Sequence, residues 1–278
     1  MRLTPIRDGQ LEKIRKLYKR ENRRKFSQTI VEGPHSVREL LVHASFLVRD
    51  VYMTPDFSER HPGVYEIIKN SDVYVHSIRE NQLEKITRDS QGVFAHINIP
   101  QQWSVKEAMN NVDVGISLAR ISDPGNLGTI IRSADAAGVD AIFICDDSVD
   151  VFSPKVIRSC VGSLFHIPVV TDCCLQDVID RAKELNINVF AADGYGDVSL
   201  YECLISSMSE DSSVKKLNLR APTLWVMGNE AHGFEGIECE GLDARISIPI
   251  YGQAESLNVA IASSIVMYIS ALLQNNER

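Results

Sequence analysis

The sequence predicts an α/β fold in which a mostly parallel sheet lies between two layers of helices. From residue 114 onward, short and almost wholly apolar segments alternate with segments of helical periodicity. Strands that are apolar on both sides belong in a parallel sheet that helices cover on both faces. The length of 278 residues leaves room for a second, smaller domain.

The elements of the larger domain follow from local signals. The helix expected over 153–162 starts with Ser153 and Pro154, which suit the cap and the first turn. Helices are also expected over 126–138 and 256–273. The segments expected as strands are 114–120, 141–145, 167–170, 187–192, 223–228 and 244–250.

The first hundred residues form a smaller α/β unit of their own. Helices are expected over 36–44 and 80–90. Strands are expected over 29–31, 46–53, 73–76 and 92–100. The stretch 101–111 is polar and predicts a linker, so the expected domains are 1–100 and 112–278.

The net charge of −8 hides a strong asymmetry along the chain. Residues 1–50 hold 12 Lys and Arg against 6 Asp and Glu, whereas the remainder holds 17 against 31. Phosphate is bound by a local basic patch rather than by the average charge, so this end of the chain is compatible with RNA. The basic residues that we expect to contact RNA are Lys16, Lys19, Arg20, Arg23 and Arg24.

The basic run has a second interpretation as a solvated amphipathic helix. Leu11, Ile14 and Leu17 fall near helical spacing and predict an apolar stripe. The two interpretations are compatible, because the stripe can dock the helix while the basic side chains face a partner. Charge alone does not separate them.

Several classes of protein are excluded by the sequence. No segment is apolar over the length needed to cross a bilayer, and the polar N-terminus lacks the apolar stretch of a secretory signal. We therefore expect a cytoplasmic protein with no membrane partner. The six cysteines form no CxxC pair, so neither a zinc site nor a disulfide framework is expected. No cluster of ligand residues appears in the sequence, and no metal is expected.

Three segments place polar residues directly after predicted strands. They are 122–138, 224–234 and 246–264. Open α/β sheets bind ligands beyond the carboxyl ends of their strands, and the free N–H groups of a helix start suit an anion. Taken singly, each segment is also an ordinary capped turn.

In combination and in this order, the segments closely resemble the three motifs of the SpoU (TrmH) group of the SPOUT superfamily, over residues 112–278. The matching residues are Asn126, Gly128 and Arg132, then Gly228, Asn229, Glu230 and Gly233, then Ile248, Pro249, Ser256, Leu257 and Asn258. Residues 1–100 are similar to the small RNA-binding domain that precedes this domain in many members. There, Val31, Glu32 and Gly33 resemble its first strand and turn.

The resemblance implies a fold, a methyl donor and an assembly. The C-terminal domain is expected to form a trefoil knot whose loops bind S-adenosylmethionine, and knots are rare exceptions to ordinary topology. Members of the group are homodimers whose catalytic site takes residues from both subunits. The residues that carry over to the donor site are Met227, Gly228, Asn229, Ile248, Pro249 and Leu257.

The resemblance also implies the reaction, which is methyl transfer to a ribose 2′-hydroxyl of RNA. The residues that carry over to the catalytic site are Arg132, Asn126, Glu230, Ser256 and Asn258. Arginine stays protonated in nearly all proteins. We therefore expect Arg132 to bind the target phosphate and stabilise the developing alkoxide, with Glu230 as its charge partner.

Ribosomal RNA is the expected substrate, and three alternatives remain open from the sequence. One is a methyltransferase that acts on transfer RNA. Another is an RNA-binding protein that kept the knot and lost activity, although Arg132, Glu230 and Asn258 are all retained. The third is an unrelated α/β enzyme acting on a small metabolite, which the basic N-terminal run and the missing glycine-rich phosphate loop disfavour.

Overall fold

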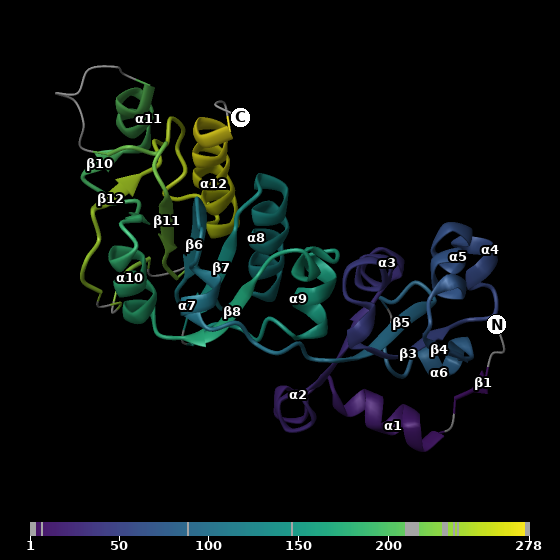
Figure 1. Ribbon diagram of the computed structural model, residues 1–278. Coiled ribbons are helices and arrows are strands. Elements are labelled where there is room, and N and C mark those ends of the chain that lie inside the picture. Colours follow the sequence, from purple (N-terminus) through teal and green to yellow (C-terminus); the bar gives the residue numbers. More distant parts are fainter. Residues whose placement is uncertain are drawn as a thin grey trace. The chain divides into compact units, whose positions relative to one another are not determined.

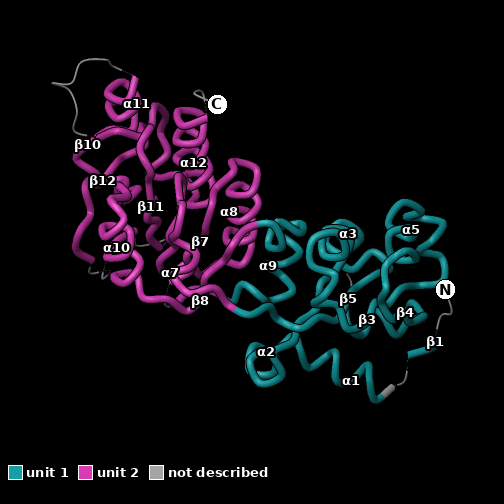
Figure 2. Tube along the Cα trace, in the orientation of Figure 1, with its two compact units in different colours: residues 1–101, 150–166 teal, residues 102–149, 167–278 magenta. Residues whose placement is uncertain are grey.

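The chain forms two compact units in the computed structural model (Figures 1 and 2). The first unit comprises Met1–Gln101 and Asp150–His166, and the second comprises Gln102–Val149 and Ile167–Arg278. The sequence places 150–166 in the C-terminal domain, whereas the structure groups this segment with the first unit. The structure describes residues 4–6, 8–87, 89–145, 147–208, 217–229, 233–235, 237 and 239–275.

The second unit is built on a seven-stranded sheet in the order β10-β12-β9-β11-β6-β7-β8 (Figure 1). Every neighbouring pair in this sheet is parallel. The strands are β6 (Val114–Leu118), β7 (Ala141–Cys145), β8 (Val169–Cys173), β9 (Asn188–Ala192), β10 (Val198–Ser199), β11 (Thr223–Met227) and β12 (Ala244–Ser247). The predicted α/β class with a mostly parallel sheet is therefore confirmed, and the structure adds the short strand β10. The trefoil knot stays a prediction.

Helices cover both faces of this sheet (Figure 1). On one face, α8 (Pro124–Ala137) packs against α12 (Val259–Asn275), and Trp225 of β11 donates a hydrogen bond from Nε1 to Ser270 Oγ of α12 at 2.9 Å. On the other face, Leu224 and Val226 belong to one apolar cluster with α7 (Val105–Ala108) and α10 (Leu175–Glu184). Alternate residues of one strand thus serve opposite layers, as a strand's two-residue period requires.

Four helices of the second unit depart from the sequence predictions. Helix α7 lies within the stretch 101–111 that the sequence predicts as a linker, and no prediction covered α10 or α11 (Leu200–Met208). Helix α12 begins at Val259 rather than at residue 256. Residues 251–258 are all exposed. No helix in the described part of the chain is long and apolar enough to span a bilayer.

The first unit has a five-stranded mixed sheet in the order β1-β4-β3-β5-β2. Its strands are β1 (Thr4–Pro5), β2 (Gln28–Glu32), β3 (Val48–Met53), β4 (Tyr74–Ser77) and β5 (Val93–Asn98). Its helices are α1 (Asp8–Lys16), α2 (Arg20–Phe26), α3 (Pro34–His43), α4 (Phe57–Arg60), α5 (Pro62–Asn70), α6 (Glu80–Leu83) and α9 (Pro154–Ser159), with 3-10 turns at Ser45–Leu47 and Ser163–Phe165. The predicted α/β pattern of this unit is present.

The basic run forms two helices, α1 and α2, rather than one. Ile14 and Leu17 are buried in a cluster with Tyr52 of β3, so the apolar stripe does dock this segment on the sheet. Lys16, Lys19, Arg20 and Arg24 are exposed. We keep these four in the proposed RNA-binding set.

Arg23 differs from its neighbours because it is buried. Its Nη1 donates hydrogen bonds of 2.8 Å to the carbonyl oxygens of Leu17 and Tyr18. Its Nε and Nη2 donate to Asp150 Oδ2 at 2.9 and 2.6 Å. The side chain therefore joins the turn between α1 and α2 to the segment 150–166 of the same unit, and we remove it from the RNA-binding set.

We predict that Arg23→Ala destabilises the first unit while Arg24→Ala does not. Removing the guanidinium leaves Asp150 Oδ2 and two backbone carbonyls without this donor, which costs up to about 3–5 kcal/mol for a largely buried pair. Urea unfolding followed by circular dichroism measures the loss. An exposed substitution changes stability by about 0.5 kcal/mol or less. Equal urea midpoints for the two variants would contradict the structural role of Arg23.

Candidate active site

The segments with polar residues after strands meet at the carboxyl edge of the second unit's sheet. Strands β6 and β11 are neighbours in register, with Leu118 beside Met227 at their ends. From β6 the chain adds β7 and β8 on one side, and then crosses to β9 on the other side of β11. A reversal of this kind creates the crevice in which open α/β sheets bind ligands.

The first segment leaves β6 and enters α8 through a capped turn. Asp123 is the N-cap, and its Oδ1 accepts the backbone N–H of Asn126 at 2.8 Å. Pro124 occupies the first turn, where a missing N–H costs nothing. This geometry fixes Asn126 at the start of the helix, beside the edge of the sheet.

The third segment is tied directly to the first. Asn258 Nδ2 donates a hydrogen bond to Asn126 Oδ1 at 3.0 Å, although the two residues lie 132 positions apart. Asn258 Oδ1 accepts the backbone N–H of Ala260 at 2.8 Å and so caps α12. Two turns further on, Ser264 Oγ donates to Ser133 Oγ at 2.9 Å. These two side-chain contacts align one face of α8 with α12, from the helix starts at the site to the serines two turns further on.

The second segment is held by backbone contacts just beyond β11. Asn229 and Gly233 exchange two backbone hydrogen bonds of 2.8 and 2.9 Å. Asn229 Nδ2 donates to the carbonyl oxygen of Arg120 at 2.8 Å, just beyond the end of β6. A Cβ atom on Gly228 would lie 2.3 Å from the Gly233 carbonyl oxygen, so only glycine fits there. Glu230 lies outside the described residues.

The residues expected to bind the methyl donor lie along this edge in two groups. Met227 and Gly228 are buried at the end of β11, and Asn229 is partly buried. Ile248 and Pro249 are partly buried just beyond β12, and Leu257 is exposed. Strand β9, which ends at Ala192, lies between β11 and β12. The surface that the two groups offer combines apolar side chains with backbone groups at strand ends, which suits a flat heterocycle.

The expected catalytic residues are only partly brought together. Asn126 and Asn258 are hydrogen-bonded, whereas Arg132 and Ser256 are exposed. Ser133 faces α12, and successive residues turn by about 100° around a helix, so Arg132 projects away from the Asn126–Asn258 pair. The reactive groups therefore do not form one closed cluster among the described residues of a single chain.

Sequence reasoning missed three residues at this edge. Arg120 has a left-handed backbone with φ of 58°, which is uncommon for a residue other than glycine. Its charged side chain at the end of an apolar strand was the available signal. Tyr195 and Tyr251 follow the neighbouring strands β9 and β12 and are almost fully exposed. Nothing in the local sequence distinguishes these tyrosines from ordinary loop residues.

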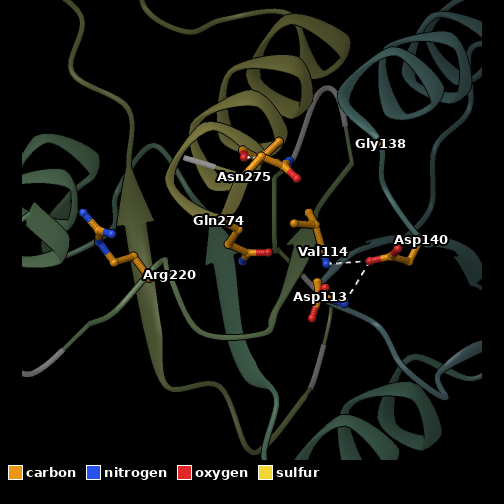
Figure 3. Close-up of a pocket in the computed structure, with 8 residues that line it drawn as sticks. Asp113, Val114, Gly138, Asp140, Arg220, Gln274 and Asn275 are labelled. Atoms are coloured by element: carbon orange, nitrogen blue, oxygen red, sulfur yellow. Dashed lines mark hydrogen bonds between the residues drawn. The ribbon is translucent and has the colours of Figure 1, made fainter. Parts of the chain in front are cut away.

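A polar hollow lies at the opposite edge of the same sheet (Figure 3). The Asp140 carboxylate accepts the backbone N–H groups of Asp113 and Val114 at 2.8 and 2.9 Å, and it thereby holds the start of β6. Gln274 donates to the carbonyl oxygens of Leu219 and Ala221. These polar groups hold the backbone in place, and the hollow is remote from the candidate site.

Comparisons with known proteins identify the family. Residues 113–268 match the SpoU rRNA Methylase family. The chain is 30% identical over 258 residues to the 23S rRNA (guanosine(2553)-2'-O)-methyltransferase RlmP of Bacillus subtilis, covering 91% of this chain and 92% of that protein. It is 27% identical over 248 residues to the 23S rRNA (guanosine-2'-O-)-methyltransferase RlmB of Neisseria meningitidis, covering 87% and 94%.

A solved structure agrees in fold over nearly the whole chain. The AdoMet-bound rRNA methyltransferase from Sinorhizobium meliloti has a TM-score of 0.73 at 25% identity, covering 96% of each chain. These comparisons define an RNA methyltransferase that uses S-adenosylmethionine. More particularly, the chain belongs to the SpoU rRNA methylase family.

We predict that Gly228→Ala weakens binding of S-adenosylmethionine. The new methyl group meets the Gly233 carbonyl oxygen, and relieving such overpacking costs about 1–3 kcal/mol, or roughly 5- to 150-fold in affinity. Isothermal titration calorimetry measures the change. Gly252→Ala is the matched control, because a Cβ there meets nothing within 4 Å. Equal affinities for the two variants would show that the loop after β11 does not shape the donor site.

Proposed function

We propose that this chain transfers a methyl group from S-adenosylmethionine to a ribose 2′-hydroxyl of ribosomal RNA. The observation that carries the proposal is the hydrogen bond between Asn126 and Asn258, which joins two of the three SpoU motifs at the carboxyl edge of the sheet. The names of the relatives in Bacillus subtilis and Neisseria meningitidis support both the ribosomal substrate and the 2′-hydroxyl acceptor.

The reaction is an in-line displacement. The 2′-oxygen attacks the methyl carbon of the donor, a C–O bond forms, the C–S bond breaks, and S-adenosylhomocysteine leaves. The hydroxyl proton passes to solvent as the bond forms. A hydroxyl is a weak nucleophile, so the site must orient it and stabilise the negative charge that develops on oxygen.

Each catalytic residue has a proposed role in that step. Arg132 binds the phosphate of the target nucleotide and stabilises the developing alkoxide, because a guanidinium keeps its proton. In the dimer proposed below, Asn126 and Asn258 form a hydrogen-bonded floor that the partner subunit's Arg132 reaches, and Ser256 positions the phosphate. Glu230 is the charge partner of Arg132 in this proposal.

The donor site is proposed at the ends of β11 and β12. Gly228 and Asn229 leave backbone groups close to the crevice, and Met227 supplies an apolar wall. Ile248, Pro249 and Leu257 complete the site from the β12 side. The knotted loops that the family implies hold the donor in a bent form between the two groups.

The first unit is proposed to bind RNA, and the protein is proposed to act in the cytoplasm, where its substrate is. Lys16, Lys19, Arg20 and Arg24 are exposed on α1, α2 and the turn between them. Such contacts to phosphate strengthen binding without reading sequence.

We also propose a homodimer, in which a second copy completes the site. Helix α12 exposes Ile261, Tyr268 and Leu272, whose exposed fractions are 50%, 43% and 61%. Spacings of seven and four residues put these apolar side chains on one face of the helix. The exposed Arg132 lies on the neighbouring helix α8. Among the described residues of its own chain, Arg132 does not lie in a closed site. A partner subunit that covers this face gives Arg132 access to the partner's site.

The central test is transfer of labelled methyl from S-adenosylmethionine to RNA that lacks the modification. We expect a 2′-O-methyl nucleoside from ribosomal RNA with the wild-type protein. Arg132→Ala is expected to lower the rate by roughly 100- to 1,000-fold while donor affinity stays unchanged, as loss of a charge-stabilising donor does.

Two results would contradict this assignment, and a third would contradict the role given to Arg132. Methylation of a base would exclude the ribose acceptor, and transfer to transfer RNA alone would exclude the ribosomal substrate. An Arg132→Lys enzyme with near-normal turnover and an acid-shifted pH profile would indicate a true general base at position 132.

The proposed RNA-binding role of the first unit predicts a change in salt dependence. Arg24→Ala should lower the slope of log affinity against log salt by about one, because one phosphate contact is lost. Lys69→Ala on α5 is the control, since Lys69 is exposed but pairs with Glu66 outside the basic run. Filter binding at several salt concentrations measures both slopes, and identical slopes would refute the contact.

The dimer predicts a mass of twice 31.0 kDa by sedimentation equilibrium. Leu272→Glu should give a monomer that has lost methyl transfer, because a charge on the apolar stripe cannot be buried without a partner. Phe46→Glu is the matched control, since Phe46 is a more exposed apolar residue of the first unit. A fully active monomer would overturn the shared site.

A further inference from the structure

Three side chains with ligand atoms for metals converge in the first unit, and none of them belongs to the methyltransferase motifs. Glu39 Oε2 lies 3.5 Å from His43 Nε2 and 3.3 Å from His166 Nε2. One ligand atom from each residue lies within 4.8 Å of the other two. The imidazole rings of His43 and His166 meet edge to face, with centroids 4.4 Å apart.

The fold holds these residues in place by two features. Glu39 and His43 are four positions apart on α3, so they lie on one face of the helix. His166 ends the 3-10 turn Ser163–Phe165, and that turn approaches α3 through Gly162. A Cβ on Gly162 would lie 2.5 Å from Glu39 Cβ, and its φ of 97° also favours glycine. Glycine at position 162 therefore allows the turn to pack closely against α3, which brings His166 next to Glu39.

Two of the three separations between ligand atoms fit tetrahedral coordination. Ligand atoms about 2.0–2.1 Å from a zinc ion, arranged tetrahedrally, are separated by roughly 3.3–3.4 Å. The two Glu39–His separations of 3.5 and 3.3 Å match this spacing. Arg38 Nη1 bonds to the other carboxylate oxygen, Oε1, and so orients Oε2 toward the histidines.

We infer that Glu39, His43 and His166 form a binding site for a divalent transition metal ion of the zinc type. Two imidazoles and one carboxylate are a donor set that such ions prefer, and water completes the coordination. The side chains are partly exposed, at 17% for Glu39, 46% for His43 and 24% for His166, so an ion can enter from solvent. The bound ion links residues 162–166 to α3.

The site was not expected from the sequence for a clear reason. Two of its ligands are separated from the third by more than a hundred positions, and no ligand spacing on the printed sequence marks them. A clip between such distant parts removes conformational freedom from the unfolded chain, and so it stabilises the unit that it closes.

The test is titration of the metal-free, full-length protein with zinc chloride by calorimetry. We expect one zinc per chain in this site. Glu39→Gln, His43→Asn and His166→Asn should each weaken binding by at least about tenfold, the lower bound for loss of even an outer-sphere partner. His35→Asn is the matched control, because His35 is exposed on the same helix but outside the cluster.

A second readout separates this site from zinc bound elsewhere on the chain. Zinc should raise the unfolding temperature of the wild type and of His35→Asn, and it should not raise that of His166→Asn. Equal zinc affinity in all variants would overturn the site, as would equal weakening by His35→Asn. The three side chains would then form ion pairs only.

Discussion

Two side-chain hydrogen bonds make one site from loops that are far apart in the sequence. Asn258 to Asn126 joins the start of α12 to the start of α8, and Asn229 to the carbonyl of Arg120 joins the end of β11 to the end of β6. The parallel sheet brings the strand ends to a common edge, and the amides then fix the loops there. The positions of Asn126, Asn229 and Asn258 depend directly on these contacts.

The first unit is also held together by contacts between distant parts of the chain, but these are ion pairs rather than amide hydrogen bonds. Glu32 is buried, accepts a hydrogen bond from Tyr18, and pairs with Arg158 at 2.8 Å. Burial raises the pKa of Glu32, while hydrogen bonds from Thr87 and Arg158 oppose that rise. Arg23 and Asp150 form a second pair between the same two stretches of chain. Buried charges without partners are costly, so these pairs specify where 150–166 docks.

Local patterns predicted the strands well, because a buried parallel strand is apolar throughout; β7 at 141–145 matches its predicted bounds. Local patterns failed where contacts between residues far apart in the sequence determine the structure. The sequence assigns segment 150–166 to the second domain, because no local pattern shows that Asp150 pairs with Arg23. The break between α1 and α2 has no proline or glycine to mark it. The motif order indicated the site, but the bond from Asn126 to Asn258 spans 132 positions and no periodicity could show it.

The central claim is that the first and third motifs act as one unit through that bond. A double-mutant cycle on methyl transfer with Asn126→Ala and Asn258→Ala tests it most directly. If the two amides work as a pair, the double variant loses little more activity than the worse single variant, as groups that act together do. If the losses multiply independently, the two motifs are not coupled and the account of the site is wrong.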